Sequence, residues 1–227
     1  MAYKISRNDL SPIKVFVETG KRRTFVGAVD WPGWCRSGRD ENTALQALLD
    51  YGPRYAQVLH SGGIEFHVPT DASAFVVTER HDGDATTDFG APAIVLDADS
   101  EPMDRTELER SLAVLLACWQ AFDRAVQRAT GRELRKGPRG GGRDLERIVD
   151  HVLEADRAYL AQLAWKHKGQ ELSRTRQAIL DALDVAVHGD LPEQGPRGGV
   201  VWPPRYFVRR VAWHVLDHAW EIEDRIV

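Results

Sequence analysis

Cysteine is almost absent from this sequence: Cys35 and Cys118 are the only two, and they lie far apart in unlike contexts. Two such residues cannot build a disulfide framework, and sparse cysteine is typical of proteins in a reducing compartment. The first ten residues, MAYKISRNDL, lack the apolar segment of a secretory signal. We therefore expect a cytoplasmic protein.

Long apolar runs and an excess of positive charge are lacking as well. The longest apolar run, LAVLLACW at residues 112–119, is far shorter than the roughly 20 residues that a membrane-spanning helix needs. The formal net charge of -4 argues against a nucleic-acid-coating protein and against membrane attachment through basic residues. With 43% hydrophobic and 28% charged residues, the composition is that of a soluble globular protein.

The first hundred residues have the composition and alternation of β-strands. The expected strands are IKVFVET (13–19), TFVGAVDWPGW (24–34), GIEFHVP (63–69) and AFVVTER (74–80). A helix is expected over 40–58, and Gly52-Pro53 should break or kink it. Residues 81–102 look like an irregular connection in which acidic, small and proline residues cluster. This composition favours a domain boundary there, and we predict domains 1–97 and 98–227.

After this boundary the apolar residues recur with the period of a helix. Four helices are expected, over about 104–129, 144–165, 172–187 and 204–227. No strand pattern lies among them, which is typical of a four-helix bundle. The predicted fold class is therefore α+β in two domains, a small α/β domain followed by an all-α bundle.

The last expected helix carries two histidines four residues apart, His214 and His218. At 100° per residue both lie on the core-facing edge of that helix, next to Glu221. A buried imidazole is costly unless its nitrogens find partners, and side chains at this spacing can converge on one ion. His151, on the expected helix 144–165, also lies at the edge of an apolar stripe, beside two alanines. It is the candidate third ligand.

Spacing alone does not decide between a metal site and ordinary packing. A histidine on an apolar face is more often a core residue that bonds to a backbone carbonyl or a carboxylate. Two nitrogens also do not complete a metal site, because catalytic zinc centres usually take three protein ligands and leave one position open. The sequence therefore leaves both interpretations open, a metal site and ordinary core packing.

The C-terminal half, from about Asp104, resembles the DinB-like (DinB/YfiT) four-helix bundles. The segments VDHVLEADRAY and AWHVLDHAWE match a family layout with one histidine on the second helix and a His-x-x-x-His pair on the last. The resemblance implies that His151, His214 and His218 bind a divalent metal. Family members include thiol-dependent transferases and isomerases, so it also implies an enzyme that uses a low-molecular-weight thiol.

The N-terminal segment VFVETGKRRTFVGAVDWPGWCRSGRDENTALQALLDY is similar to the small HicB-like fold. Strands, a Pro32-Gly33 turn, Gly38 and an acidic helix start at Asp40 carry this resemblance. HicB proteins are partners of RNA-cleaving toxins, often with an added DNA-binding segment. No such segment is visible here, so the resemblance implies a partner-binding shape and no nucleic-acid binding.

Several chemical assignments follow from these patterns. A three-imidazole site suits borderline divalent ions, of which we expect zinc or nickel. Glu221 is the candidate to orient a ligand imidazole or to act as a base, against the alternative of a solvated surface charge. The arginine-rich segment GRELRKGPRGGGR (131–143) can grip an anionic group or serve as a plain connector. Cys118 lies on an apolar face and is expected to be core.

Three functions therefore remain in view. The first is a metal-dependent transferase, isomerase or hydrolase acting on a small molecule that the sequence does not name. The second is an interaction or scaffold module in which a HicB-like domain binds a partner and the histidines are not catalytic. The third is a bundle homodimer whose histidines only satisfy hydrogen bonds.

Overall fold

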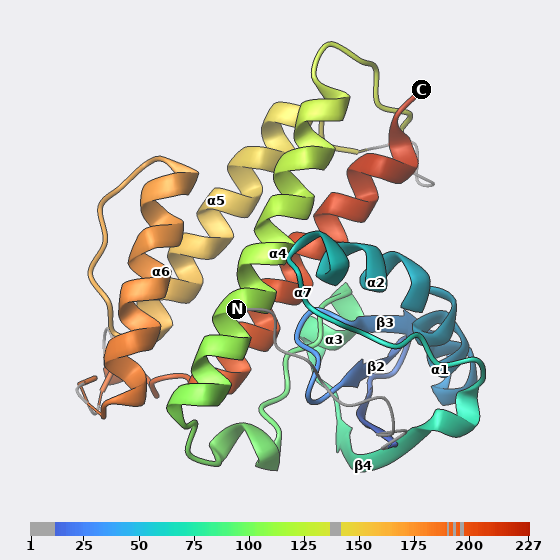
Figure 1. Ribbon diagram of the computed structural model, residues 1–227, viewed down its shortest axis with the longest axis horizontal. Helices are drawn as coiled ribbons and strands as arrows, with labels where there is room; N and C mark the ends of the chain where they lie inside the picture. Colours follow the sequence, from blue (N-terminus) through green and yellow to red (C-terminus); the bar gives the residue numbers. More distant parts are fainter. Residues whose placement is uncertain (1–11, 137–141, 190, 193, 196–197) are drawn as a thin grey trace. The chain divides into compact units, whose positions relative to one another are not determined.

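The computed structural model describes residues 12–136, 142–189, 191–192, 194–195 and 198–227 (Figure 1). The chain divides into two compact units, Met1–Glu101 and Pro102–Val227, so the division lies between residues 101 and 102 where the sequence predicted 97 and 98. A mixed sheet lies in the first unit and the long helices lie in the second. The layout is α+β.

A four-stranded sheet forms the base of the first unit, with strand order β3-β2-β1-β4. The strands are β1 (Ile13–Thr19), β2 (Thr24–Ala28), β3 (Cys35–Gly38) and β4 (Phe75–Asp82). β1 pairs antiparallel with β2, and β2 antiparallel with β3, as short connections allow. β4 pairs parallel with β1, which requires the long crossover that the helices supply.

Two helices make that crossover, α1 (Glu41–Asp50) and α2 (Gly52–Ser61). Asp40 caps α1 by accepting a hydrogen bond from the Thr43 backbone N–H. Pro53 stands in the first turn of α2, which confirms the predicted break at Gly52-Pro53. The fully buried Trp34 fixes this layer, because its indole Nε1 donates to the Leu48 carbonyl at 2.9 Å.

The predicted strand over 63–69 does not form, so that prediction was wrong. Gly63 takes a left-handed φ of 74° and the segment then runs without regular structure. Phe66 packs edge-on against Trp34 and Tyr55, with ring centroids 5.1 and 5.3 Å away. The apolar alternation therefore reflects an aromatic anchor, since none of the described strands pairs with this backbone.

The connection after β4 contains a short helix, α3 (Ala85–Phe89), that the sequence pattern did not reveal. Glu18, fully buried in β1, anchors this segment. Its carboxylate accepts hydrogen bonds from the Thr87 hydroxyl at 2.5 Å, from the Ala93 N–H at 3.0 Å and from the Ile94 N–H at 3.2 Å. A single buried carboxylate thus accepts hydrogen bonds from backbone N–H groups that lie outside the β-sheet.

The described part of the second unit contains four long α-helices, and their spans agree with the expected ones. They are α4 (Arg105–Ala129), α5 (Leu145–Gln162), α6 (Leu172–Val187) and α7 (Pro204–Arg225). Asp104 and Asp144 cap α4 and α5, and Pro204 opens α7 where a missing N–H costs nothing.

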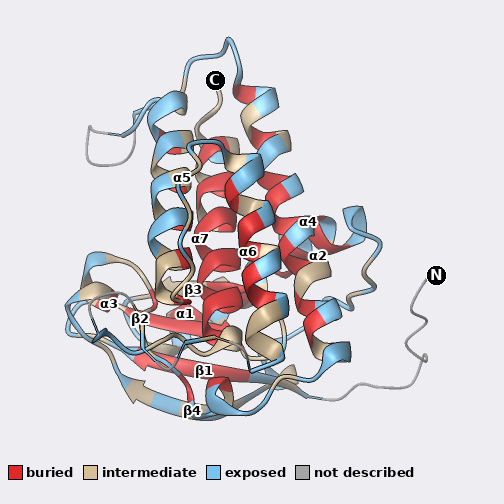
Figure 2. Ribbon diagram, turned by 90° about the vertical axis from the view of Figure 1, so that its left-hand side faces the viewer, coloured by how far each residue is buried: buried red, intermediate tan, exposed pale blue. Residues whose placement is uncertain are grey.

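α7 packs against α4, α5 and α6. Figure 2 shows buried residues along most of α7, whereas α5 and α6 keep exposed outer faces. None of the helices in the described part of the chain is both long and apolar enough to span a membrane.

Glu18→Gln should destabilise the first unit, because an amide cannot match a carboxylate that accepts three charge-assisted hydrogen bonds. We expect the free energy of unfolding to fall by about 2 kcal/mol. Urea unfolding followed by tryptophan fluorescence measures this change. The exposed Glu101→Gln is the matched control and should leave the midpoint in place. Equal midpoints for the two variants would contradict the anchoring role of Glu18.

Candidate metal centre

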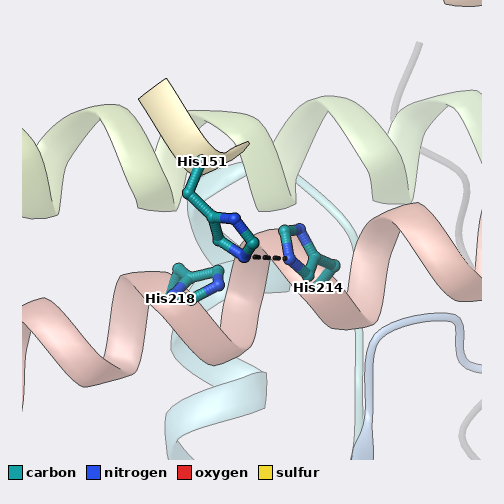
Figure 3. Close-up of side chains that lie close together, drawn as sticks. All are labelled: His151, His214 and His218. Atoms are coloured by element: carbon teal, nitrogen blue, oxygen red, sulfur yellow. Dashed lines mark hydrogen bonds between the residues drawn. The ribbon is translucent and has the colours of Figure 1, made fainter. Parts of the chain in front are cut away.

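Three histidine side chains from two helices converge inside the second unit. His151 comes from α5, and His214 and His218 come from successive turns of α7 (Figure 3). One nitrogen of each ring lies within 4.8 Å of the others. His214 and His218 are 7% and 8% exposed, and His151 is half-buried. Among the described residues this is the cluster whose donors suit a metal ion.

The contact between α5 and α7 sets the spacing of these rings. The Nε2 atoms of His151 and His214 are 3.2 Å apart. Ring centroids are separated by 5.1 Å for His151 and His214, 5.0 Å for His151 and His218, and 4.7 Å for His214 and His218. The three rings meet at steep angles, so no pair is stacked face to face.

The donor set fits a divalent ion. Nitrogen ligands about 2.0–2.1 Å from a tetrahedral zinc ion lie about 3.3 Å from one another. The His151–His214 separation of 3.2 Å already matches that value. The separations within the cluster reach up to 4.8 Å, which is wider than the roughly 3.3 Å expected around zinc. A small movement of the side chains would bring all three nitrogens to the ion.

The surroundings keep two of the imidazoles neutral. Burial, followed by the positive charge of Arg143, lowers the pKa of His151 to about 4. Burial and the neighbouring histidines hold the pKa of His214 well below its usual value. At neutral pH both rings therefore carry a lone pair that a cation can accept, which is the protonation state a metal ligand needs.

Mutual hydrogen bonding does not satisfy these rings. His214 Nε2 faces His151, but its buried Nδ1 has no hydrogen-bond partner among the described residues. A histidine kept only as a core residue would be expected to bond through both nitrogens. The packing alternative therefore accounts for the contact between the rings and leaves a buried polar atom unexplained.

Glu221 lies beside the cluster, where it supports His218. Its Oε2 is 2.8 Å from His218 Nδ1, and its Oε1 accepts from Arg225 Nη1 at 2.6 Å. Burial raises the pKa of this carboxyl, but the hydrogen bonds and charges of His218 and Arg225 outweigh that effect and leave the pKa lowered. The position fits the predicted orienting role; the predicted role as a base stays a prediction, because both oxygens are engaged.

Arg225 extends this chain of contacts away from the rings. Its Nε donates to the Arg135 carbonyl at 2.8 Å and its Nη2 to the Arg143 carbonyl at 2.9 Å. The guanidinium thus contacts Glu221 and two carbonyls of the arginine-rich segment, those of Arg135 and Arg143. Of that segment, residues 137–141 with Arg139 lie outside the described residues.

Other residues near the rings were not indicated by the sequence pattern. Tyr159 on α5 contacts His214 edge-on, with centroids 5.7 Å apart. The Arg210 guanidinium lies 5.4 Å from the Tyr159 ring and 5.0 Å from the Trp213 ring. Tyr159 follows His151 by eight residues, which at 100° per residue places it about 80° around the helix, so the spacing did not indicate it.

Three other polar or reactive side chains are exposed or inert. Asp150 and Glu154, carboxylates close to His151 in sequence, are exposed. Cys118 is fully buried as predicted, and burial raises the pKa of its thiol, which rules out a ready thiolate.

No family model matches this chain, and no curated protein or solved structure matches it either. The geometry of the site is therefore the basis for assigning a function.

Glu221→Gln should weaken metal binding, because it removes the negative charge that orients His218 and favours a neighbouring cation. We expect a loss of about 10-fold or more in zinc affinity. Chelator-competition titration of tag-free protein measures it, with the exposed Glu154→Gln on α5 as the control. Unchanged affinity in Glu221→Gln would show that this carboxylate does not support the ligand set.

Metal-free protein should lose stability as the pH falls. His151 has a pKa of about 4 when folded against 6.5 as its ordinary value, so the unfolded chain binds a proton first. The stability is fully present above about pH 6.5 and is lost as the pH falls towards about 4. Thermal melts across this window should show a shallower pH dependence for His151→Gln. Parallel curves for both proteins would contradict the lowered pKa.

Proposed function

We propose that this chain is a divalent-metal-binding protein of the DinB-like type, with His151, His214 and His218 as ligands, and that it is a metal-dependent enzyme. The observation that carries the proposal is the convergence of three largely buried imidazole nitrogens within 4.8 Å. Their order along the chain, one on α5 and two on α7, is the layout on which the sequence resemblance depends.

The residues around the cluster would have different roles in such a metal site. Three neutral imidazoles would hold zinc or nickel and leave the charge of the ion undiminished. When bound, such an ion lowers the pKa of a coordinated water or holds a thiol as thiolate. Glu221 orients the His218 ring, and Arg225 keeps Glu221 ionised and in place.

The charges around the site favour an anionic substrate. Beyond burial and the neighbouring histidines, the positive charges of Arg210 and Arg143 lower the pKa of His214. Both arginines therefore contribute positive charge around this ring. A thiolate or a carboxylate would be attracted there. This supports a thiol-dependent transferase or isomerase, or a hydrolase, with a low-molecular-weight thiol as cosubstrate in the first case.

A second proposal concerns the N-terminal unit, which we infer to be a HicB-like partner-binding module. Gly33 takes a φ of 92° in the turn after Pro32, and a side chain on Gly38 would meet the Ala44 backbone nitrogen at 2.5 Å. These are the positions that carry the resemblance. β4 lies at one edge of the sheet and offers a strand to a partner, which in this proposal includes a second copy of the chain.

Metal analysis separates these proposals. Protein purified without a histidine tag and analysed by mass spectrometry should contain about one zinc or nickel ion per chain. Single substitutions His151→Ala and His214→Ala should each remove most of it, because two imidazoles rarely retain such an ion.

His167→Ala is the matched control, since His167 lies outside the cluster and should leave metal content unchanged. Wild-type protein without stoichiometric metal, or cluster variants that retain it, would overturn the metal proposal. The scaffold role would then be the better account.

A further inference from the structure

A carboxylate occupies an apolar stripe in the middle of α5. Ile148, Val152, Asp156 and Leu160 follow one another at four-residue spacing, and all four are fully buried. Neither carboxylate oxygen of Asp156 has a hydrogen-bond partner among the described residues. Burying an acid in this way is costly whether it is ionised or protonated, because its polar atoms have lost their water.

Arg176 on α6 is the charged neighbour of Asp156. α6 packs directly against α5, and both side chains have buried polar atoms. Burial raises the pKa of Asp156 and the positive charge of Arg176 opposes that rise, although no direct hydrogen bond joins the two groups. One end of the guanidinium is held by α4, since Nη1 donates to the two Asp123 oxygens at 2.9 and 2.8 Å. The other end is buried, and its Nε and Nη2 have no partner among the described residues.

Trp119 on α4 has a further buried donor, its indole Nε1, without a partner in the described part of the chain. The Arg176 guanidinium lies 5.5 Å from the Trp119 ring, so Arg176 is the common neighbour of the tryptophan and the aspartate. Two acceptor atoms and three donor atoms from three helices are therefore buried and unsatisfied by the described residues in one region. Such a concentration is unusual in a protein interior.

The chemistry of these atoms defines what can bind between Asp156 and Arg176. An anion would satisfy the guanidinium but would be repelled by the carboxylate, and a cation would meet the reverse conflict. The group that fits is uncharged and both donates and accepts hydrogen bonds. In a protein interior the small molecule with these properties is water.

We propose that one or more water molecules are bound between Asp156 and Arg176 and bridge the carboxylate to the guanidinium inside the four-helix unit. This site ties α5 to α6, and through Asp123 it ties both to α4. It also fixes the position of α5 close to His151, five residues before Asp156. The inference does not depend on metal binding.

The ionisation state of Asp156 shows whether water bridges Asp156 and Arg176 or whether the pair is dry, with no water between the two side chains. With the described side chains alone, burial raises the pKa of the Asp156 carboxyl to about 7. Bound water would restore solvation, and Arg176 would then hold the carboxylate ionised. Besides Arg176, Asp156 affects Tyr159 on its own helix, and Asp123 lies beyond the guanidinium on α4.

Thermal melts of wild type and Asp156→Asn at pH 5 and pH 8 test the proposal in the full chain. If water bridges an ionised pair, the variant should melt about 4 °C or more below wild type at both pH values. If the pair is dry, the folded pKa near 7 exceeds the ordinary value of 3.8, and wild type loses stability as the pH rises between them. The variant would then exceed wild type at both pH values, by a wider margin at pH 8 than at pH 5.

Asp150→Asn is the matched control, because Asp150 lies exposed on the same helix, and its melting temperature should follow wild type. A crystal structure of the wild type gives a second, independent reading. Density for water within hydrogen-bond distance of an Asp156 oxygen and of Arg176 Nη2 is the expected result. A direct Asp156–Arg176 hydrogen bond, or a dry gap between them, would overturn the proposal, as would the melting pattern of a dry pair.

Discussion

The approach of α5 to α7 places three imidazole nitrogens within 4.8 Å of one another, and the candidate site depends on that contact. Neutral rings in a mostly buried position need partners for their nitrogens. The 3.2 Å contact between His151 and His214 satisfies only part of that need, since His214 Nδ1 has no partner among the described residues. A shared cation is the partner that would use all three lone pairs together. The proposed chemistry therefore depends on how α5 packs against α7.

Charged groups around the rings act in two opposite ways. Burial is the main cause of the lowered pKa values of His151 and His214, and nearby arginines add to it: Arg143 for both rings and Arg210 for His214. Glu221 provides the compensating negative charge, and Arg225 holds it in place. The positive charges that contribute to the lowered pKa of His214 would also attract an anionic substrate.

Buried carboxylates are used for different purposes in the two units. Glu18 accepts hydrogen bonds from a hydroxyl and from backbone N–H groups, and it thereby holds an irregular segment against the sheet. Asp156 receives no such donors from the described residues, and its neighbour Arg176 has buried donors left over. The first acid holds a local segment in place, whereas the second, in the proposed water-bridged pair, would link α5 to α6 and, through Asp123, to α4.

The sequence by itself determined the elements whose signal is local. Helical period and capping residues predicted the four long helices, and the i, i+4 spacing put His214 and His218 on one face. Local pattern misled at residues 63–69, where alternation served an aromatic contact, and it did not reveal the roles of Asp156 or Arg225. Only the tertiary structure decided that His151 meets the other two rings and that the helix of Arg176 packs against that of Asp156. The physical reason is that these contacts join distant parts of the chain, and their geometry depends on how whole helices pack rather than on any neighbour in sequence.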